Sequence, residues 1–233
     1  MDQSTQDKIW DYWQTTGIKA FTSNTGRLDY VGRLVTRFGK SKVLTIGVGD
    51  LYLEKILLKN RMDLYVLDPS QTSISSATQS LSLDSERAIV GYSQNMPYES
   101  DFFDVIVMSE VLEHLDDDIL SGTIKELHRV LKKGGRFIGT VPFNENLKKS
   151  EVMCPHCDAV FHKVGHVRSF DKLSMLNTLK SCFNESDIKI WIKFLPAWKI
   201  LNFKGKLVAS LKKILEFFSI YGEKFNLIVI ATK

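Results

Sequence analysis

The sequence has little of what builds disulfide-bonded or membrane-spanning proteins. Only three of its 233 residues are cysteines. Two of them share one Cys-x-x-Cys motif, which argues against a disulfide framework. No apolar run follows a basic N-terminal start, and no apolar stretch is long enough to cross a bilayer. We therefore expect a cytoplasmic protein without a signal peptide or a membrane span.

The chain as a whole also lacks a strong excess of either charge, because its formal net charge is +4. The charges are nevertheless unevenly distributed. Residues Lys163–Lys233 hold 13 Lys and Arg against 5 Asp and Glu, so this part carries +8 and the rest −4. A solvated basic face would explain this distribution. A phosphate-bearing partner or an anionic surface is the alternative.

A third glycine is missing from the stretch around which the chain is organised, Lys42–Asp50. Its first part, Val43–Ile46, is apolar or β-branched, which is typical of a buried parallel strand. The strand runs into Gly47 and Gly49, which permit a sharp turn and a close approach of a ligand to the backbone. A helix pattern follows at once, which predicts the opening of a nucleotide-binding α/β unit. Because Leu51 stands where a further glycine would be, this motif alone discriminates weakly.

Further apolar runs predict six more strands and the helices between them. The expected strands are Asp63–Asp68, Ala88–Gly91, Phe103–Met108, Arg136–Val141, Ile188–Phe194 and Leu227–Thr232. Helices are expected over 70–81, over 116–132, after Ser169, and as a basic amphipathic segment at about 205–219. Such β/α alternation predicts a parallel sheet with helices on both faces.

The length fits one domain, 1–233, with three additions. Residues 1–40 carry two helix patterns, and the aromatic residues of the first, Trp10 and Trp13 among them, either pack the helix down or form a lid over a ligand. Residues 143–168 are expected to be an irregular insert. Residues 195–225 are expected to be a helical insert before the last strand.

The order of these pieces resembles the class I S-adenosylmethionine-dependent methyltransferases, in particular the type 11 or ubiquinone-type subgroup. The matching stretches are Val43–Asp50, Leu64–Asp68, Gly91–Tyr98, Phe103–Leu115 and Leu131–Pro142. The resemblance implies a Rossmann-like, doubly wound sheet of seven strands, mostly parallel, with an antiparallel last strand. An NAD(P)-dependent enzyme is the other nucleotide-binding alternative, but the chain has no room for a separate substrate domain.

The resemblance also implies roles for individual residues. Gly47 and Gly49 would line the methionine part of the cofactor. Asp68 lies 19 residues beyond Gly49, where a doubly wound fold places the acid that holds a ribose diol, unless it caps the next helix. Ser93 and Gln94 would lie near the adenine, and Ser109 and Glu110 beneath the cofactor. Two departures, Leu51 and Tyr92 (where relatives usually carry an aspartate), raise the alternative of a degenerate enzyme that only binds.

Glu110, Glu113 and His114 stand at i, i+3 and i+4. If this turn is helical, the three share one face at the carboxyl edge of the sheet. Two carboxylates and an imidazole there suit acid–base catalysis or a divalent metal. The pattern is similar to that of ubiquinone-type O-methyltransferases and of small-RNA 2′-O-methyltransferases. In the latter it holds a metal together with a later histidine, for which His166 or His162 is a candidate. A capped helix start with a core histidine is the structural alternative.

A second candidate metal site is Cys154-x2-Cys157-x4-His162-x3-His166. Two thiolates and two imidazoles suit tetrahedral zinc, and a metal would stabilise a segment with little core of its own. A subset of class I methyltransferases has a similar insert. His156 could replace one histidine, and free thiols are the alternative. The two metal hypotheses compete for His166.

From these observations we expect transfer of a methyl group from S-adenosylmethionine to an oxygen rather than a nitrogen, with His114, Glu110 and Glu113 as catalytic residues. Small-molecule, saccharide, lipid-like and RNA hydroxyls all stay open as acceptors, as does the oligomeric state. A degenerate cofactor-binding protein, with its zinc segment as a partner surface, is the alternative. The helix at 205–219 either packs against the body or contacts a membrane surface or a lipid-like acceptor.

Overall fold

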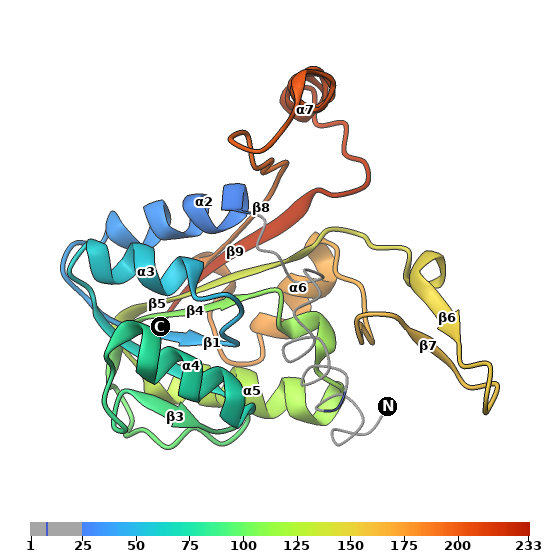
Figure 1. The fold of residues 1–233 in the computed structure, drawn as a ribbon. Coiled ribbons are helices and arrows are strands. Elements are labelled where there is room, and N and C mark those ends of the chain that lie inside the picture. Colours follow the sequence, from blue (N-terminus) through green and yellow to red (C-terminus); the bar gives the residue numbers. More distant parts are fainter. Residues whose placement is uncertain (1–7, 9–24) are drawn as a thin grey trace.

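The computed structural model describes Lys8 and residues 25–233, and it confirms the predicted α/β fold. Seven strands form one sheet in the order β3-β2-β1-β4-β5-β9-β8 (Figure 1). The strands β3, β2, β1, β4 and β5 are parallel to one another, whereas β9 is antiparallel to both of its neighbours, β5 and β8. The strands are β1 (Lys42–Ile46), β2 (Asp63–Asp68), β3 (Ala88–Val90), β4 (Phe103–Ser109), β5 (Leu131–Pro142), β8 (Ile188–Lys193) and β9 (Asn226–Thr232).

Helices cover both faces of this sheet and divide the core into two layers. Along β4, Val105 and Val107 belong to the cluster beneath α2, α3 and α4, whereas Ile106 and Met108 belong to the cluster beneath α5 and α6. This alternation follows from the two-residue period of a strand, and it explains why the central strands read as continuous apolar runs. The helices are α2 (Thr25–Thr36), α3 (Tyr52–Lys59), α4 (Gln71–Leu81), α5 (Asp117–Val130) and α6 (Lys172–Leu179).

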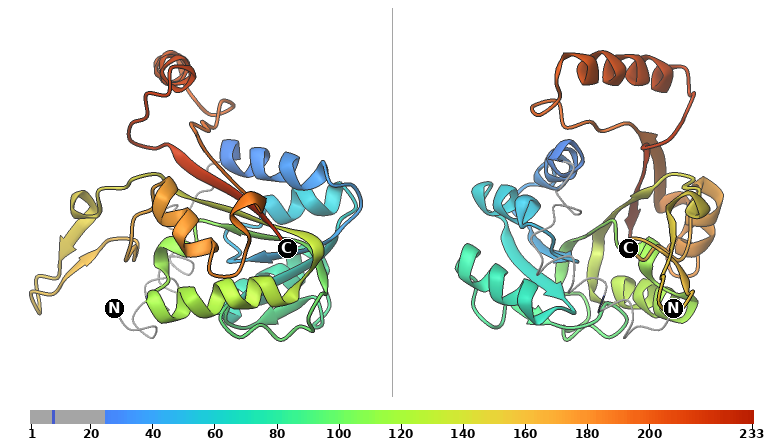
Figure 2. Two further views of the ribbon diagram at one scale, coloured as in Figure 1. Left: turned by 180° about the vertical axis from the view of Figure 1, so that it is seen from behind. Right: turned by 45° about the vertical axis from the view of Figure 1, so that its right-hand side comes forward.

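The insert after β5 is more regular than expected. It contains a short 3-10 helix (Leu147–Ser150) and an antiparallel hairpin of β6 (Glu151–Met153) and β7 (Val160–His162). The hairpin projects away from the sheet (Figures 1 and 2). The prediction that the insert is irregular was therefore partly wrong, because Cys154 and Cys157 lie in the turn of a hairpin.

The predicted basic helix is α7 (Phe203–Phe217), between β8 and β9. It stands apart from the layers that enclose the sheet (Figure 2). None of the described helices is long and apolar enough to cross a bilayer. The first expected N-terminal helix, with Trp10 and Trp13, lies outside the described residues, whereas the second corresponds to α2.

Candidate active site

The loop after β1 is fastened to the end of β2 by Asp68. This carboxylate is 1% exposed, and its Oδ2 accepts a hydrogen bond of 2.8 Å from the Val48 N–H. Its Oδ1 accepts a second bond, also of 2.8 Å, from the Ser70 N–H. The residue that caps α4 is Ser70, whose hydroxyl accepts from the Ser73 N–H, so the capping alternative for Asp68 is wrong. Asp68 lies at the glycine turn, where the ribose-binding role requires it.

The two glycines of the turn have different surroundings. Gly47 has φ +78°, and a Cβ on it would come within 2.6 Å of Val111, so the position requires glycine. A Cβ on Gly49 would meet no atom of residues 25–233 within 4 Å. Leu51 adopts the left-handed conformation a glycine would favour, with φ 62°, and its side chain is buried in the cluster beneath α2 and α3. Leu51 therefore does not fill the space above Gly49.

The loop after β3 is tied to α5. The Ser93 hydroxyl is buried and lies 2.8 Å from Thr123 Oγ1. Gln94 packs against Gly122, where an added Cβ would be 2.9 Å from Gln94 Cβ. Tyr92 is 41% exposed, so its ring does not plug a cavity. These contacts hold the loop against α5, to which the Ser93 hydroxyl makes its hydrogen bond.

At the end of β4, the chain turns through Glu110, which has a left-handed φ of 60°. Backbone strain of this kind is typical of functional sites. Glu110 Oε2 lies 3.1 Å from Arg27 Nη1, and its Oε1 accepts a bond of 3.1 Å from the Thr140 hydroxyl. Ser109 joins the same network, since its hydroxyl accepts from Arg27 Nε at 3.2 Å and lies 2.9 Å from Thr140 Oγ1. Arg27 thus links α2 to the ends of β4 and β5.

Beyond this turn the chain forms a 3-10 helix (Leu112–His114), so the α-helical face expected for the three residues is wrong. Glu110 is held by Arg27, whereas Glu113 and His114 point into the interior, where His166 joins them. The ligand atoms of Glu113, His114 and His166 all lie within 4.8 Å of one another. His166 Nε2 is 4.0 Å from Glu113 Oε1.

The backbone brings His166 to this place. The N–H groups of Val167 and Arg168 donate to the Glu113 carbonyl at 2.9 and 3.3 Å. The Arg168 guanidinium donates to the Leu115 carbonyl at 2.7 Å. The chain after the hairpin is therefore docked on the turn after β4, although more than fifty residues separate Glu113 from His166.

Burial makes Glu113 unusual. The residue is 1% exposed, and within the part of the chain that the structure describes neither carboxylate oxygen has a hydrogen-bond partner. Burial, and next the nearby Glu110, raise the pKa of Glu113 well above its ordinary value. Buried polar atoms are rarely left without a partner, because this costs about 1–3 kcal/mol each. Two unpartnered carboxylate oxygens in the interior are suitable ligands for a cation, because buried charges in proteins are normally paired or coordinate a metal.

Hydrogen bonds fix the tautomers of both histidines. His114 Nδ1 lies 3.2 Å from the Gly165 carbonyl, which can only accept, so the proton is on Nδ1 and the lone pair on Nε2. His166 Nδ1 lies 2.5 Å from Glu145 Oε2, which places its lone pair on Nε2 in the same way. Burial, followed by the neighbouring His166, lowers the pKa of His114 to about 3, so its ring is neutral. Two imidazoles and one carboxyl group form a donor set for a divalent transition metal.

A second group, Glu145, His162 and His166, lies beside the first and shares His166. His162 Nδ1 accepts a bond of 3.1 Å from the His166 N–H, which leaves the proton on its Nε2. The His162 Nε2 atom lies 3.7 Å from Glu145 Oε1, which is beyond hydrogen-bond distance, and has no partner among the described residues. Burial alone would raise the pKa of Glu145, but its bond with His166 lowers it. This tautomer of His162 offers no lone pair at Nε2, so the second group orients His166 and is less suited to binding a cation.

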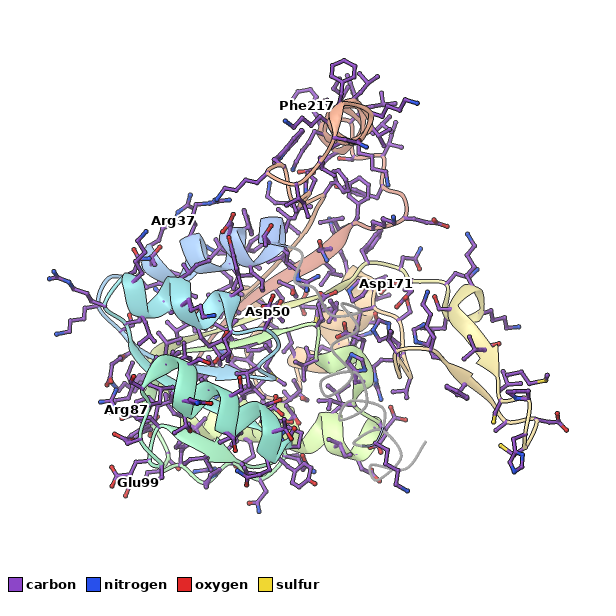
Figure 3. All side chains as sticks on the ribbon, in the orientation of Figure 1. Arg37, Asp50, Arg87, Glu99, Asp171 and Phe217 are labelled. Carbon is purple, nitrogen blue, oxygen red and sulfur yellow. The ribbon has the colours of Figure 1, made fainter. Side chains whose placement is uncertain are left out.

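The structure does not bring Cys154 and Cys157 to the histidines. The two groups of three His, Cys, Asp or Glu ligands found among the described residues contain no cysteine. Sulfur atoms lie at the far end of the projecting hairpin (Figure 3), and Cys157 is exposed. The N–H groups of His156 and Cys157, followed by the Cys157 thiol, lower the pKa of the Cys154 thiol. Of the four predicted zinc ligands, the histidines and the cysteines are therefore at different places, and His166 belongs with Glu113.

Sequence reasoning missed Arg27, Thr140 and Glu145. Glu145 lies three residues beyond β5, and side chains that follow parallel strands gather at one edge, so its position carried a signal. Thr140 lies within β5 near its end. Arg27 lies on a helix before the first strand, and no pattern in the sequence indicated that it would reach Glu110.

Comparisons with known proteins agree with this geometry. Residues 44–139 match the family model described as a methyltransferase domain. This matched range includes the glycine turn, Asp68, Glu110, Glu113 and His114.

Solved structures with this fold cover nearly the whole chain. One is a Burkholderia thailandensis 1,6-didemethyltoxoflavin N1-methyltransferase with bound 1,6-didemethyltoxoflavin and S-adenosylhomocysteine. It has a TM-score of 0.67 at 13% identity and covers 100% of this chain and 91% of its own. A SAM-dependent methyltransferase of Thermotoga maritima has a TM-score of 0.60 at 19% identity, over 97% of this chain and 99% of its own. At such identities the likeness shows the fold.

Among curated proteins, an uncharacterized protein of Methanocaldococcus jannaschii is 28% identical over 126 residues. The match spans 51% of this chain and 54% of that protein, so about half of each is shared.

Proposed function

We propose that this methyltransferase acts on a hydroxyl oxygen, and that Glu113, His114 and His166 hold a divalent cation that prepares the hydroxyl for attack. The observation that supports this most directly is Glu113, a buried carboxylate beside His114 and His166 whose two oxygens have no hydrogen-bond partner among the described residues. A cation in that place would lower the pKa of a hydroxyl that it contacts.

The remaining residues position the reactants. Asp68 would hold the ribose hydroxyls, and the open side of Gly49 would admit the methionine part of the cofactor. The acceptor oxygen gives its proton to solvent water and forms a bond to the methyl carbon, while the bond from that carbon to sulfur breaks and its electron pair stays on sulfur, which gives S-adenosylhomocysteine. Because the sulfonium is already an activated leaving group, alignment contributes most of the rate. Glu110, fixed by Arg27 and Thr140, would line the acceptor entrance.

Paired acceptors test the reaction. Small phenols, saccharides and lipid-like alcohols are compared with their amino isosteres, each with S-adenosylmethionine and with or without Mn²⁺. We expect S-adenosylhomocysteine to form with hydroxyl acceptors and to depend on the metal. Metal-independent turnover of the amines would overturn the hydroxyl assignment.

A glycine pair tests the cofactor site separately by calorimetry with S-adenosylmethionine and S-adenosylhomocysteine. Gly49→Ala fills open space, so we expect normal stability and weakened cofactor binding. Gly47→Ala forces a Cβ against Val111 at a positive φ, and we expect it to lower the free energy of unfolding by about 2 kcal/mol. Absence of cofactor binding by folded wild-type protein would refute the proposed activity, whereas cofactor binding without turnover of any acceptor would favour the degenerate alternative.

A further inference from the structure

Helix α7 has its apolar face turned away from the protein. Phe203, Leu207, Leu211, Ile214 and Phe218 follow one another at intervals of three or four residues and so share one face. Phe203 is 83% exposed, and Leu207 and Phe218 are 65% exposed. A surface helix of a globular protein normally buries this stripe against the core. Phe217, which neighbours the stripe on α7, is 83% exposed and is labelled at the outer end of the molecule in Figure 3.

The opposite face of α7 fastens the helix to the sheet through polar contacts. Glu216 Oε2 accepts bonds of 2.9 Å from the Phe194 N–H and 2.8 Å from Lys213 Nζ. Lys212 Nζ donates to the Glu223 carbonyl at 2.9 Å. Ala209, seven residues before Glu216 and hence on the same face, is 2% exposed. The described residues thus hold the polar side of the helix inward, which fixes the apolar side outward.

The charge around the stripe indicates what it contacts. The helix has four lysines and one glutamate, and a fifth lysine, Lys199, precedes it. Lys204 and Lys206 lie on either side of the apolar stripe and are exposed. Apolar side chains rimmed by lysines are the pattern of a helix that lies in the plane of a bilayer. The apolar surface continues into both flanking segments, where Ile200 is 76% and Ile220 is 54% exposed.

We propose that α7 is an interfacial helix that binds the surface of an anionic lipid bilayer. Phenylalanine and leucine side chains insert between the lipids, and the lysines contact acidic headgroups. A second copy of the chain fits less well, because two such helices would bring their lysines together.

The position of α7 in the fold determines which edge of the sheet would face a bound bilayer. The helix leaves the sheet between Lys193 and Asn226, which pair with each other, and Asn226 also pairs with Pro142 at the end of β5. The neighbouring strand β4 ends at Ser109, beside Thr140. The helix therefore arises from the sheet edge that carries the proposed active site, so bilayer binding would bring that edge to the lipid surface. This last step rests on the proposed function, whereas bilayer binding itself does not.

Vesicle co-sedimentation of the full chain tests the proposal, with vesicles of phosphatidylcholine alone and of phosphatidylcholine mixed with phosphatidylglycerol. We expect binding to the anionic vesicles, weaker binding to the neutral ones, and a decrease with added salt. Leu207→Asp should weaken binding roughly tenfold or more, because it removes an inserted side chain and adds a repelled charge. Lys206→Glu should weaken it on the order of fivefold or more.

Leu173→Asp is the matched control, because Leu173 is also a helical leucine that is 65% exposed and lies on α6, away from α7. Both leucines are exposed, so both variants should fold, which thermal unfolding verifies. No sedimentation with either kind of vesicle, or equal effects of the two leucine variants, would overturn the proposal. So would a wild-type dimer by light scattering that Leu207→Asp converts to a monomer, because a second copy would then cover the stripe. Since no cofactor or acceptor is present, failure here leaves the proposed methyl transfer intact.

Discussion

The two predicted metal sites differ in how closely the structure brings their side chains together. Cys154 and Cys157 satisfy the best-known spacing for zinc, yet they lie at the end of a projecting hairpin, away from His162 and His166. Glu113, His114 and His166 have no such spacing, yet the fold gathers them in the interior. The spacing of candidate ligands in the sequence is thus a weaker guide to a metal site than the edge of the sheet at which distant segments converge.

The largest effect should come from Glu113→Gln. The substitution removes the charged ligand and leaves an amide among two imidazoles, so we expect affinity for Mn²⁺ or Zn²⁺ to fall by more than about a hundredfold. Isothermal titration calorimetry measures this directly. The matched control is Glu99→Gln, since Glu99 is exposed and far from the group (Figure 3). If both variants bind the metal as wild type does, the Glu113 group is not the metal site.

A second buried carboxyl group, Glu54, shows what burial alone does to the pKa of a glutamate and so serves as a comparison for Glu113. Burial raises the pKa of Glu54 to about 7, against about 4.5 in the unfolded chain. The folded protein therefore holds the Glu54 proton more tightly than the unfolded chain does. The contribution of Glu54 to the free energy of unfolding is fully present below pH 4.5 and is lost as the pH rises through 7. We expect Glu54→Gln to be more stable than wild type at pH 8 by up to about 3 kcal/mol. The two should have similar stability at pH 4.

Urea unfolding at the two pH values measures this difference. A variant that is destabilised equally at both would show that Glu54 is held by contacts of its neutral form rather than penalised by burial. Glu113 should behave differently, because a bound cation would offset the cost of its buried charge. Glu54 belongs to neither of the two groups of candidate metal ligands among the described residues.

Glu145→Gln should have the next largest effect on metal affinity after Glu113→Gln. Glu145 accepts the Nδ1 proton of His166 and so keeps the lone pair on Nε2, and loss of such a partner typically weakens metal binding by about 10–100-fold. The direct ligands stay in place, so the decrease should be smaller than for Glu113→Gln. Glu151→Gln serves as the control, because Glu151 is exposed on β6 of the same insert. An unchanged affinity in Glu145→Gln would show that other contacts orient the ring.

Most of the architecture was predictable because it depends on local patterns. The apolar runs of β1, β2 and β4 and the glycine at position 47 dictate a parallel sheet with a turn at one edge. The contact between Glu113 and His166 was not predictable in the same way. It depends on backbone hydrogen bonds from Val167 and Arg168 to Glu113, which no periodicity reveals. The orientation of α7 was likewise hidden, since its amphipathic pattern is the same whichever face is buried.

The smallest effect on metal binding should come from replacing both hairpin cysteines. In Cys154→Ser/Cys157→Ser, the Glu113 group is untouched, so we expect the high-affinity equivalent of metal to remain. Metal analysis of the purified variant and of wild type measures this, and Glu113→Gln provides the comparison in which the equivalent should be lost. If the cysteine variant instead loses the metal and Glu113→Gln keeps it, the hairpin must fold back so that its thiolates reach His162 and His166. The comparison between the two sites would then be reversed, because sequence spacing would have identified the ligands that the fold had separated.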